Sequence, residues 1–189
     1  HTGISASAIV GDGRVEKVVC ANGLEFFADV VIIGVGVLPN VELAQEAGIE
    51  VDNGIIVDEF CRTNDAHIVA AGDCANHFNA IYGRRMRLES VPNASEQGKT
   101  AAASLCGLTK AYKSLPWFSS DQYDLKLQIA GLSQGYDQVV VRGDKLASRS
   151  FAAFYFKEGR LIAADCINRP QEFMLSKKLI TENIVIEAS

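Results

Sequence analysis

Short apolar runs alternate with turn residues over the first part of the chain. Three β-rich runs lie between Ile4 and Val35, separated by Gly11-Asp12-Gly13 and by Ala21-Asn22-Gly23. Asp-Gly and Asn-Gly between such runs are strong hairpin signals. The run Val30-Val31-Ile32-Ile33 is apolar at every position, as expected of a strand that is buried on both faces. The pattern predicts a meander that leads into a buried strand.

The middle of the chain alternates helix and strand signals. Asn40 is placed to cap a short helix, "VELAQEAG", which Gly48 would end. Asp52-Asn53-Gly54 predicts a turn that pairs "IEV" with "IIV". A polar link over 61–66 leads to a predicted strand over 67–71. A further strand-like run, "RMRLESV", then leads to a predicted helix from Pro92 to Gly107.

The last part of the chain has the pattern of an antiparallel sheet. Four runs predict strands: "LKLQIAGL", "QVVVRG", "RSFAAFYF" and "RLIAADCI". Lys157-Glu158-Gly159 predicts the turn between the last two, and a helix is expected from about Pro170 to Ile180. From residue 115 onward the sequence therefore predicts a separate α+β domain.

Composition narrows the function classes. The chain has 189 residues, 48% of them hydrophobic, which is enough for one large or two small domains with cores. A net charge of -5 argues against nucleic-acid binding, and the longest apolar runs fall well short of the roughly 20 residues that span a bilayer. The five cysteines show no C-x-x-C pair and no zinc spacing. We therefore expect a cytoplasmic protein without a metal site, a nucleic-acid partner or a membrane partner.

The glycines after the apolar run at 30–33 suggest a dinucleotide fingerprint. Gly34 and Gly36 have the spacing, and Asp58 stands about where a ribose-binding acid would lie. Pro39 replaces the third glycine, however, and the turn predicted at 52–54 does not fit a βαβ crossover. The glycines still indicate a close approach of the backbone to a ligand or another strand.

The stretch "IVAAGDCAN", residues 68–76, has three interpretations. Cys74 could be a reactive thiol, although scattered cysteines are more often small buried hydrophobes. Asp73 could cap the next turn, or its carboxylate could accept hydrogen bonds from the hydroxyls of a ligand at a strand end. The predicted helix start at Pro92 is a second candidate site, because unpaired N–H groups there suit an anion or an electron-rich carbonyl.

A resemblance brings these features together. The segments "DVVIIGVGVLPNVELAQEAGIEVDNGIIVDE", "IVAAGDCAN", "RLESVPNASEQGKTAAASLCG", "SDQY" and "INRPQEF" follow one another as in FAD-dependent, NAD(P)H-oxidising ferredoxin reductases. These reductases lie within the pyridine nucleotide-disulphide oxidoreductase superfamily. The resemblance covers essentially the whole chain. It implies the later portion of a three-part enzyme, with partial FAD- and NAD(P)-binding three-layer α/β domains followed by a C-terminal α+β interface domain with an antiparallel sheet.

The resemblance also implies domain boundaries and residue roles. Residues 1–40 would end the NAD-binding domain, 41–114 would be the return segment of the FAD-binding domain, and 115–189 the interface domain. Gly72 and Asp73 would lie at the flavin ribityl chain, with the Asp73 carboxylate as the ligand. The other expected cofactor-binding positions are Val91 and Pro92 at the pyrimidine edge of the flavin, Glu89 and Gly36 on the nicotinamide side, and Trp117 near the rings.

The implied activity is electron transfer from NAD(P)H through FAD to a [2Fe-2S] ferredoxin, with a possible homodimer and no catalytic side chain, because the cofactor supplies the chemistry. Ser119 stands where relatives commonly have a tryptophan before "SDQ". Arg84, Arg85 and Arg87 form a cluster that could dock an acidic ferredoxin. The alternatives are a disulphide reductase of the same superfamily, a flavoprotein of the apoptosis-inducing-factor type, and a non-catalytic module.

Overall fold

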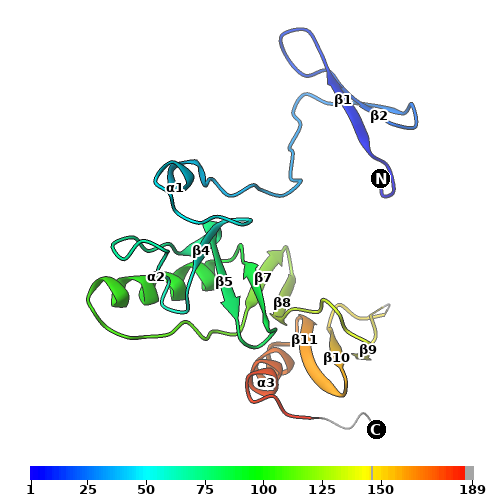
Figure 1. The fold of residues 1–189 in the computed structure, drawn as a ribbon. Helices are drawn as coiled ribbons and strands as arrows, with labels where there is room; N and C mark the ends of the chain where they lie inside the picture. Colours follow the sequence, from blue (N-terminus) through cyan, green and yellow to red (C-terminus); the bar gives the residue numbers. More distant parts are fainter. Residues whose placement is uncertain (146, 186–189) are drawn as a thin grey trace. The chain divides into compact units, whose positions relative to one another are not determined.

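The computed structural model describes residues 1–145 and 147–185, and the chain divides into two compact units, His1–Leu38 and Pro39–Ser189 (Figure 1). Both contain β-sheet, and the second also contains the helices. The predicted mixture of α/β and α+β elements is therefore present. The domain boundaries proposed from the resemblance, at 40/41 and 114/115, stay a prediction.

The first unit is a three-stranded antiparallel sheet. It comprises β1 (Ala6–Val10), β2 (Lys17–Cys20) and β3 (Glu25–Phe27), in that spatial order. The turns fall where the glycine dipeptides predicted them, and Gly13 and Gly23 adopt φ values of 70° and 82°. These values belong to the left-handed region that glycine enters without steric cost. The predicted meander is confirmed.

The buried strand predicted at Val30-Val31-Ile32-Ile33 is wrong. These residues follow β3 without forming a strand, and the side chains of Val30 and Ile32 are 76% and 92% exposed. An apolar run becomes a strand only where neighbouring strands accept and donate its backbone hydrogen bonds. Within the described residues no strand pairs with this run.

The first half of the second unit builds a small sheet and a long helix. A short helix, α1 (Glu42–Glu46), precedes β4 (Ile55–Val57). After a 3-10 turn, η1 (Gly72–Cys74), come β5 (Ala75–Asn79) and β6 (Arg84–Arg87). The sheet order is β4-β5-β6, with β4 and β5 parallel and β5 and β6 antiparallel. Helix α2 (Val91–Leu105) follows at once.

Two local predictions here are wrong. Residues 67–71 do not form a strand; a single bridge joins Val69 to Arg62, and the strand begins after the Gly-Asp pair. The apolar residues at 67–71 favoured a strand there. Of the two described segments, however, only Ala75–Asn79 has strands to pair with on both sides, β4 on one and β6 on the other. In addition Val41, not Asn40, is the N-cap of α1, and no side chain caps it. Gly48 ends the turn as predicted, at φ 72°.

The C-terminal part is one antiparallel sheet covered by a helix. The strands are β7 (Trp117–Gln122), β8 (Leu125–Gly131), β9 (Gln138–Arg142), β10 (Phe151–Lys157) and β11 (Arg160–Ile167), in the order β7-β8-β11-β10-β9. Helix α3 (Pro170–Thr181) follows β11. All four predicted strands and the helix are confirmed. The turn at Glu158 and Gly159 has φ values of 51° and 72°, as a tight two-residue hairpin requires.

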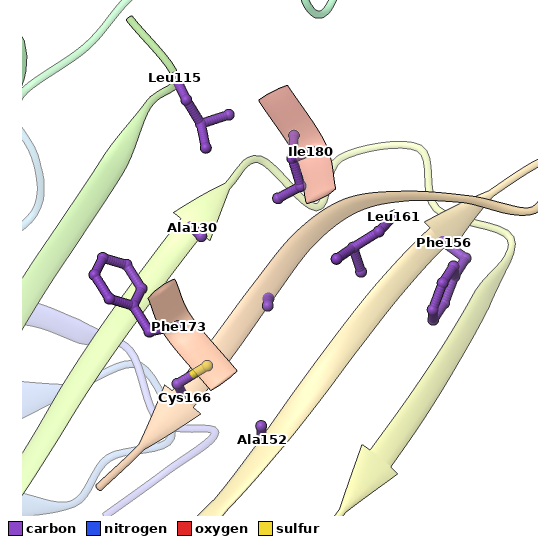
Figure 2. Close-up of a cluster of buried hydrophobic side chains, with 9 residues drawn as sticks. Leu115, Ala130, Ala152, Phe156, Leu161, Cys166, Phe173 and Ile180 are labelled. Carbon is purple, nitrogen blue, oxygen red and sulfur yellow. The ribbon is translucent and has the colours of Figure 1, made fainter. Parts of the chain in front are cut away.

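The core of this part lies between the sheet and α3. Figure 2 shows the side chains of Phe173 and Ile180 directed from α3 toward the strands, where small residues make room for them. Ala130, Ala152 and Ala164 are fully buried on the central strands. Small side chains on the sheet and large ones on the helix allow close packing. The full cluster comprises Leu115, Ala130, Ala152, Phe156, Leu161, Ala164, Cys166, Phe173 and Ile180.

Tyr82 joins the β5–β6 turn to the C-terminal sheet. Its hydroxyl accepts a hydrogen bond from the Leu132 N–H at 2.8 Å and donates to the Ile162 carbonyl at 2.9 Å. The position opposite must be glycine, because a Cβ at Gly131 would lie 2.6 Å from the hydroxyl and 2.2 Å from the Ile162 carbonyl oxygen. Burial raises the pKa of Tyr82 to about 12, so the hydroxyl keeps its proton.

Replacing Tyr82 with phenylalanine is expected to lower the free energy of unfolding by about 1–3 kcal/mol. The ring stays, but the Leu132 N–H and the Ile162 carbonyl each lose their partner. Urea unfolding of both proteins measures the difference. Tyr123→Phe is the matched control, because Tyr123 is 98% exposed and should tolerate the change. Equal effects of the two substitutions would show that the Tyr82 hydroxyl does not join the two parts.

Candidate functional site

Gly72, Asp73 and Cys74 form the 3-10 turn that leads into β5. Gly72 adopts φ 84°, which explains the glycine. Ala71 is the N-cap of the turn and no side chain caps it, so the interpretation of Asp73 as a capping residue is wrong. Asp73 is exposed, and within the described residues no hydrogen bond or ion pair engages its carboxylate. The carboxylate is therefore available to a ligand.

The thiol of Cys74 is half-buried and is directed to its own turn. Its Sγ lies 3.6 Å from the Ala71 carbonyl, to which it donates. All five cysteines are free; Cys20, Cys61 and Cys166 are buried, as expected of packing residues, whereas Cys106 is exposed. Burial raises the pKa values of Cys61 and Cys166 to about 11, so both stay protonated thiols.

The backbone of the turn is held at both ends by side chains. The Gly72 N–H donates to Gln97 Oε1 at 2.8 Å, and the Asp73 carbonyl accepts from the Arg87 guanidinium at 2.8 Å. The same guanidinium pairs with the Glu89 carboxylate at 2.7 Å, and the Arg87 side chain is only 9% exposed. Arg87 thus links two predicted site residues, Asp73 and Glu89.

The start of α2 packs against this turn. A Cβ added at Gly72 would lie 3.5 Å from the Cβ of Ala94, which is in the first turn of the helix. Ser90 is the N-cap, and its Oγ accepts from the Asn93 N–H at 3.3 Å. Pro92 has no N–H, so Val91 contributes the remaining donor at this end, and its side chain is 83% exposed. The two predicted cofactor contacts, Asp73 and the helix start, are therefore neighbours.

A buried polar network lies beneath the turn. Gln97 is fully buried, and its Nε2 lies 3.0 Å from Nδ1 of His77, which is 2% exposed. One turn earlier on α2, Asn93 donates to the Leu88 carbonyl at 3.0 Å and accepts from the Tyr112 hydroxyl at 2.8 Å. The Tyr112 ring meets the His77 ring edge-on, with 5.0 Å between centroids. Amides and rings from β5, α2 and the following loop thus fix one another.

The network determines the tautomer of His77. Gln97 Oε1 accepts from the Gly72 N–H, so the amide turns its Nε2, which can only donate, toward His77. His77 Nδ1 therefore accepts and the ring proton lies on Nε2, which is buried and without a partner among the described residues. Burial, and secondarily the positive charge of Arg85, lower the pKa of His77 to about 4. The ring is neutral at physiological pH.

Trp117 and Pro92 line the same cavity, which has a volume of about 380 Å³. Trp117 packs against Phe173 with 5.8 Å between ring centroids, and Lys177 Nζ lies 4.7 Å from the Trp117 ring centroid. Trp117 and Ser119 are two residues apart on β7 and so point to the same face, opposite Ala130 and Gln128 respectively. A larger cavity of about 800 Å³ involves β4, the β5–β6 turn and the end of α3, and none of the predicted cofactor-binding residues lines it.

The remaining predicted positions belong to other segments of the chain. Gly36 lies in the first unit, where φ 96° accounts for the glycine and a Cβ would meet nothing within 4 Å. Arg84 and Arg85 are exposed and Arg87 is half-buried, and docking of a ferredoxin by these arginines stays a prediction. Arg85 donates to the carbonyls of Val57 and Asn76, and Arg87 is engaged at the turn, so only Arg84 of the three is without such a contact among the described residues.

Sequence reasoning missed Gln97, His77 and the role of Arg87. One signal was available: Asn93 and Gln97 are four residues apart and lie on one face of α2, which is otherwise rich in alanine. Two buried amides on a helix face need partners. Gln97 has the Gly72 N–H and His77, and Asn93 has the Leu88 carbonyl and the Tyr112 hydroxyl. The sequence could not show which partners they are.

Comparisons with known proteins show which family the chain resembles. Residues 1–98 match the pyridine nucleotide-disulphide oxidoreductase family, and residues 117–189 match the reductase C-terminal family. The chain is 47% identical over 174 residues to putidaredoxin reductase from Pseudomonas putida, covering 92% of this chain and 41% of that protein. It is 45% identical over 169 residues to rhodocoxin reductase from Rhodococcus erythropolis, covering 89% and 39%.

Two solved structures of reductases are similar to this chain over almost its whole length. The structure of a covalent putidaredoxin reductase–putidaredoxin complex matches 99% of this chain and 45% of that chain, with a TM-score of 0.93 and 44% identity. The ferredoxin reductase for the CYP199A2 system of Rhodopseudomonas palustris matches 98% and 46%, with a TM-score of 0.92 and 45% identity.

The chain therefore belongs to the pyridine nucleotide-disulphide oxidoreductase family. Within that family it corresponds to a portion of proteins of the ferredoxin reductase kind, and it spans less than half the length of the curated relatives it matches. In residues 1–145 and 147–185, no helix is both long and apolar enough to cross a membrane.

Proposed function

We propose that the protein to which this chain belongs transfers electrons from NAD(P)H through FAD to a [2Fe-2S] ferredoxin. The observation that carries the proposal is the contact between the Gly72–Asp73 turn and the start of α2, the two places expected to touch the flavin. The names of the relatives support it, since they include a ferredoxin–NAD(P)+ reductase from Sphingomonas, 42% identical, and the NAD+ reductase component of an anthranilate dioxygenase system, 49% identical.

The residues present fit a flavin. A free carboxylate at Asp73 suits the hydroxyls of the ribityl chain, and the Val91 N–H with the dipole of α2 suits the electron-rich pyrimidine edge. Bound FAD would supply hydride acceptance and single-electron release. The helix start would favour negative charge at that edge, and Gly72 would let the backbone adopt the turn. Pro92 and Trp117 would line the space beside the rings, and Glu89 and Gly36 would lie on the nicotinamide side.

The location and assembly are part of the proposal. Five free cysteines are consistent with a reducing compartment, which supports a cytoplasmic protein. We also propose that the full-length protein forms a homodimer. The proposed domains span residues 1–40, 41–114 and 115–189, as the resemblance implies. The match to the reductase C-terminal family over residues 117–189 lies close to the last of these boundaries.

A rubredoxin is a second candidate acceptor. Two relatives are rubredoxin–NAD+ reductases, from Pseudomonas putida and Ectopseudomonas oleovorans, each 38% identical over 160 residues. Identity is 39–49% to four reductases whose names include ferredoxin. This favours the ferredoxin.

The test is electron transfer by the full-length protein purified with its flavin. With NADH or NADPH it is expected to reduce a [2Fe-2S] ferredoxin faster than a rubredoxin, followed by the absorbance change of each acceptor. Reduction of a disulphide substrate without reduction of either iron protein would favour the disulphide reductase alternative. A flavin that neither nucleotide reduces would favour the apoptosis-inducing-factor type or a non-catalytic module.

A further inference from the structure

The dipeptide Gly72–Asp73 is fixed along its backbone while its carboxylate is left free. Gln97 holds the N–H at one end and Arg87 holds the carbonyl at the other, each at 2.8 Å. Gln97 is fully buried and the Arg87 side chain is nearly so. The Gly72–Gln97 hydrogen bond is buried and therefore costly to break, because the groups left behind would have no water to bind. The Arg87–Asp73 hydrogen bond is exposed, and the ion pair of Arg87 with Glu89 helps to keep its guanidinium in place. The direction in which the Asp73 side chain leaves the backbone is therefore set by these two side chains.

Gln97 also couples the turn to the start of α2. The residue lies on the same helix that begins at Val91, and an α-helix of 15 residues is a rigid element. Through Gln97, the helix that offers the Val91 N–H also fixes the backbone beside Asp73. His77 keeps the Gln97 amide in one orientation by accepting from its Nε2, and the Asn93 amide, 3.5 Å from Gln97 Oε1, donates on the same side as Gly72.

We propose that Gln97 is a positioning residue that sets the placement of the Asp73 carboxylate relative to the start of α2, so that both meet one flavin without rearrangement. This inference rests on the proposed function, because it takes Asp73 and the helix start as flavin contacts. Gln97 itself is buried beneath the turn and need not touch the cofactor. Binding to a preorganised site loses less conformational freedom and is tighter for that reason.

The test uses the full-length protein and the variant Gln97→Met, which keeps the length of the side chain and removes its hydrogen bonds to Gly72, Asn93 and His77. We expect the dissociation constant for FAD to rise about tenfold or more, and the visible circular dichroism of the remaining bound flavin to change, since that signal reports the asymmetry around the rings. Thr100→Val is the control: Thr100 is also buried on α2, at 2% exposure, and among the described residues it forms no hydrogen bond with the turn.

A conservative variant separates positioning from general stability. Gln97→Glu keeps an oxygen acceptor for the Gly72 N–H, and in its protonated form it also keeps a donor for His77. It is expected to bind FAD within about threefold of the wild type, even where urea unfolding shows it to be less stable. If Gln97→Met does not fold, hydrogen exchange in Gln97→Glu replaces it: a loss of protection at the Gly72 amide larger than that at the amides of β5 would contradict the proposed bond, and an equal loss, as lower overall stability alone would give, would support it.

The outcomes distinguish a failure of the proposed function from a failure of the positioning role of Gln97. A wild-type protein that binds no FAD would overturn the proposed function and this inference with it. A wild-type protein that binds FAD, together with a Gln97→Met variant of equal affinity and unchanged flavin dichroism, would overturn only the positioning role of Gln97. The positioning role would also be overturned if Gln97→Met lost no more affinity for FAD than Thr100→Val does, because both losses would then reflect lower stability alone.

Discussion

Replacing Asp73 with alanine in the full-length protein is expected to raise the dissociation constant for FAD by about tenfold to a hundredfold. Hydrogen bonds to a charged group contribute about 1.5–3 kcal/mol, which corresponds to that range. The Asp73 carboxylate has no partner among the described residues, so its removal should leave the protein's own contacts intact. Titration of the apoprotein with FAD, followed by the quenching of flavin fluorescence, measures the change.

Two further variants make this experiment specific. Asp73→Asn keeps one acceptor oxygen and is expected to fall between wild type and Asp73→Ala. Asp124→Ala removes an exposed carboxylate that pairs with Arg149 on the C-terminal sheet, and should leave FAD affinity unchanged. If Asp73→Ala bound FAD as tightly as Asp124→Ala, the carboxylate after Gly72 would not be a flavin ligand.

Lowering the pH from 6.5 to 4 is expected to cost up to about 3 kcal/mol of stability through His77 alone. The pKa of His77 is lowered to about 4 in the folded protein, whereas an unfolded histidine titrates near 6.5, and each unit of difference corresponds to about 1.4 kcal/mol. Between these values the unfolded chain binds a proton at this residue and the folded protein does not. The contribution of neutral His77 to the free energy of unfolding is thus fully present above pH 6.5 and is lost as the pH is lowered toward 4.

The histidine effect is isolated by comparing variants. Carboxylates also titrate in this range, so the quantity to measure is the difference between wild type and His77→Gln in urea unfolding at pH 7 and at pH 4.5. His77→Gln should lose less stability on acidification than wild type does. The control is His67→Gln, because His67 is exposed and should behave as wild type. Equal pH dependence in all three proteins would mean that His77 is not held neutral by its surroundings.

Elements with local signals were predictable. The hairpins after Asp12-Gly13 and Asn22-Gly23 and the turn before Gly159 follow from glycine conformations that the sequence shows directly. The start of α2 at a Ser-Val-Pro segment follows from the chemistry of helix ends. Such signals reside in a few consecutive residues, so they need no knowledge of distant parts of the chain.

Elements that depend on partners were not predictable. A strand was expected at 67–71 and is found at Ala75–Asn79, because only the second segment has neighbouring strands to pair with. Hydrophobicity does not distinguish them in the expected way: Asn76, His77 and Asn79 are polar, and they are buried because β4, β6 and α2 surround them. The same reason accounts for the run at 30–33. The sequence pointed to Asp73 as a candidate ligand, but not to the side chains that hold its turn. Gln97 lies 25 residues from Gly72, whose N–H it binds, and Arg87 lies 14 residues from Asp73, whose carbonyl it binds.

A crystal structure of the full-length protein with FAD bound is the most direct test of the proposed flavin contacts at Asp73 and at the start of α2. We expect the Asp73 carboxylate to lie within hydrogen-bond distance of a ribityl hydroxyl and the start of α2 at Val91 to face the pyrimidine edge. The Gly72 N–H should still donate to Gln97. Bound FAD with the Asp73 carboxylate in solvent and the start of α2 away from the ring would contradict the proposed contacts.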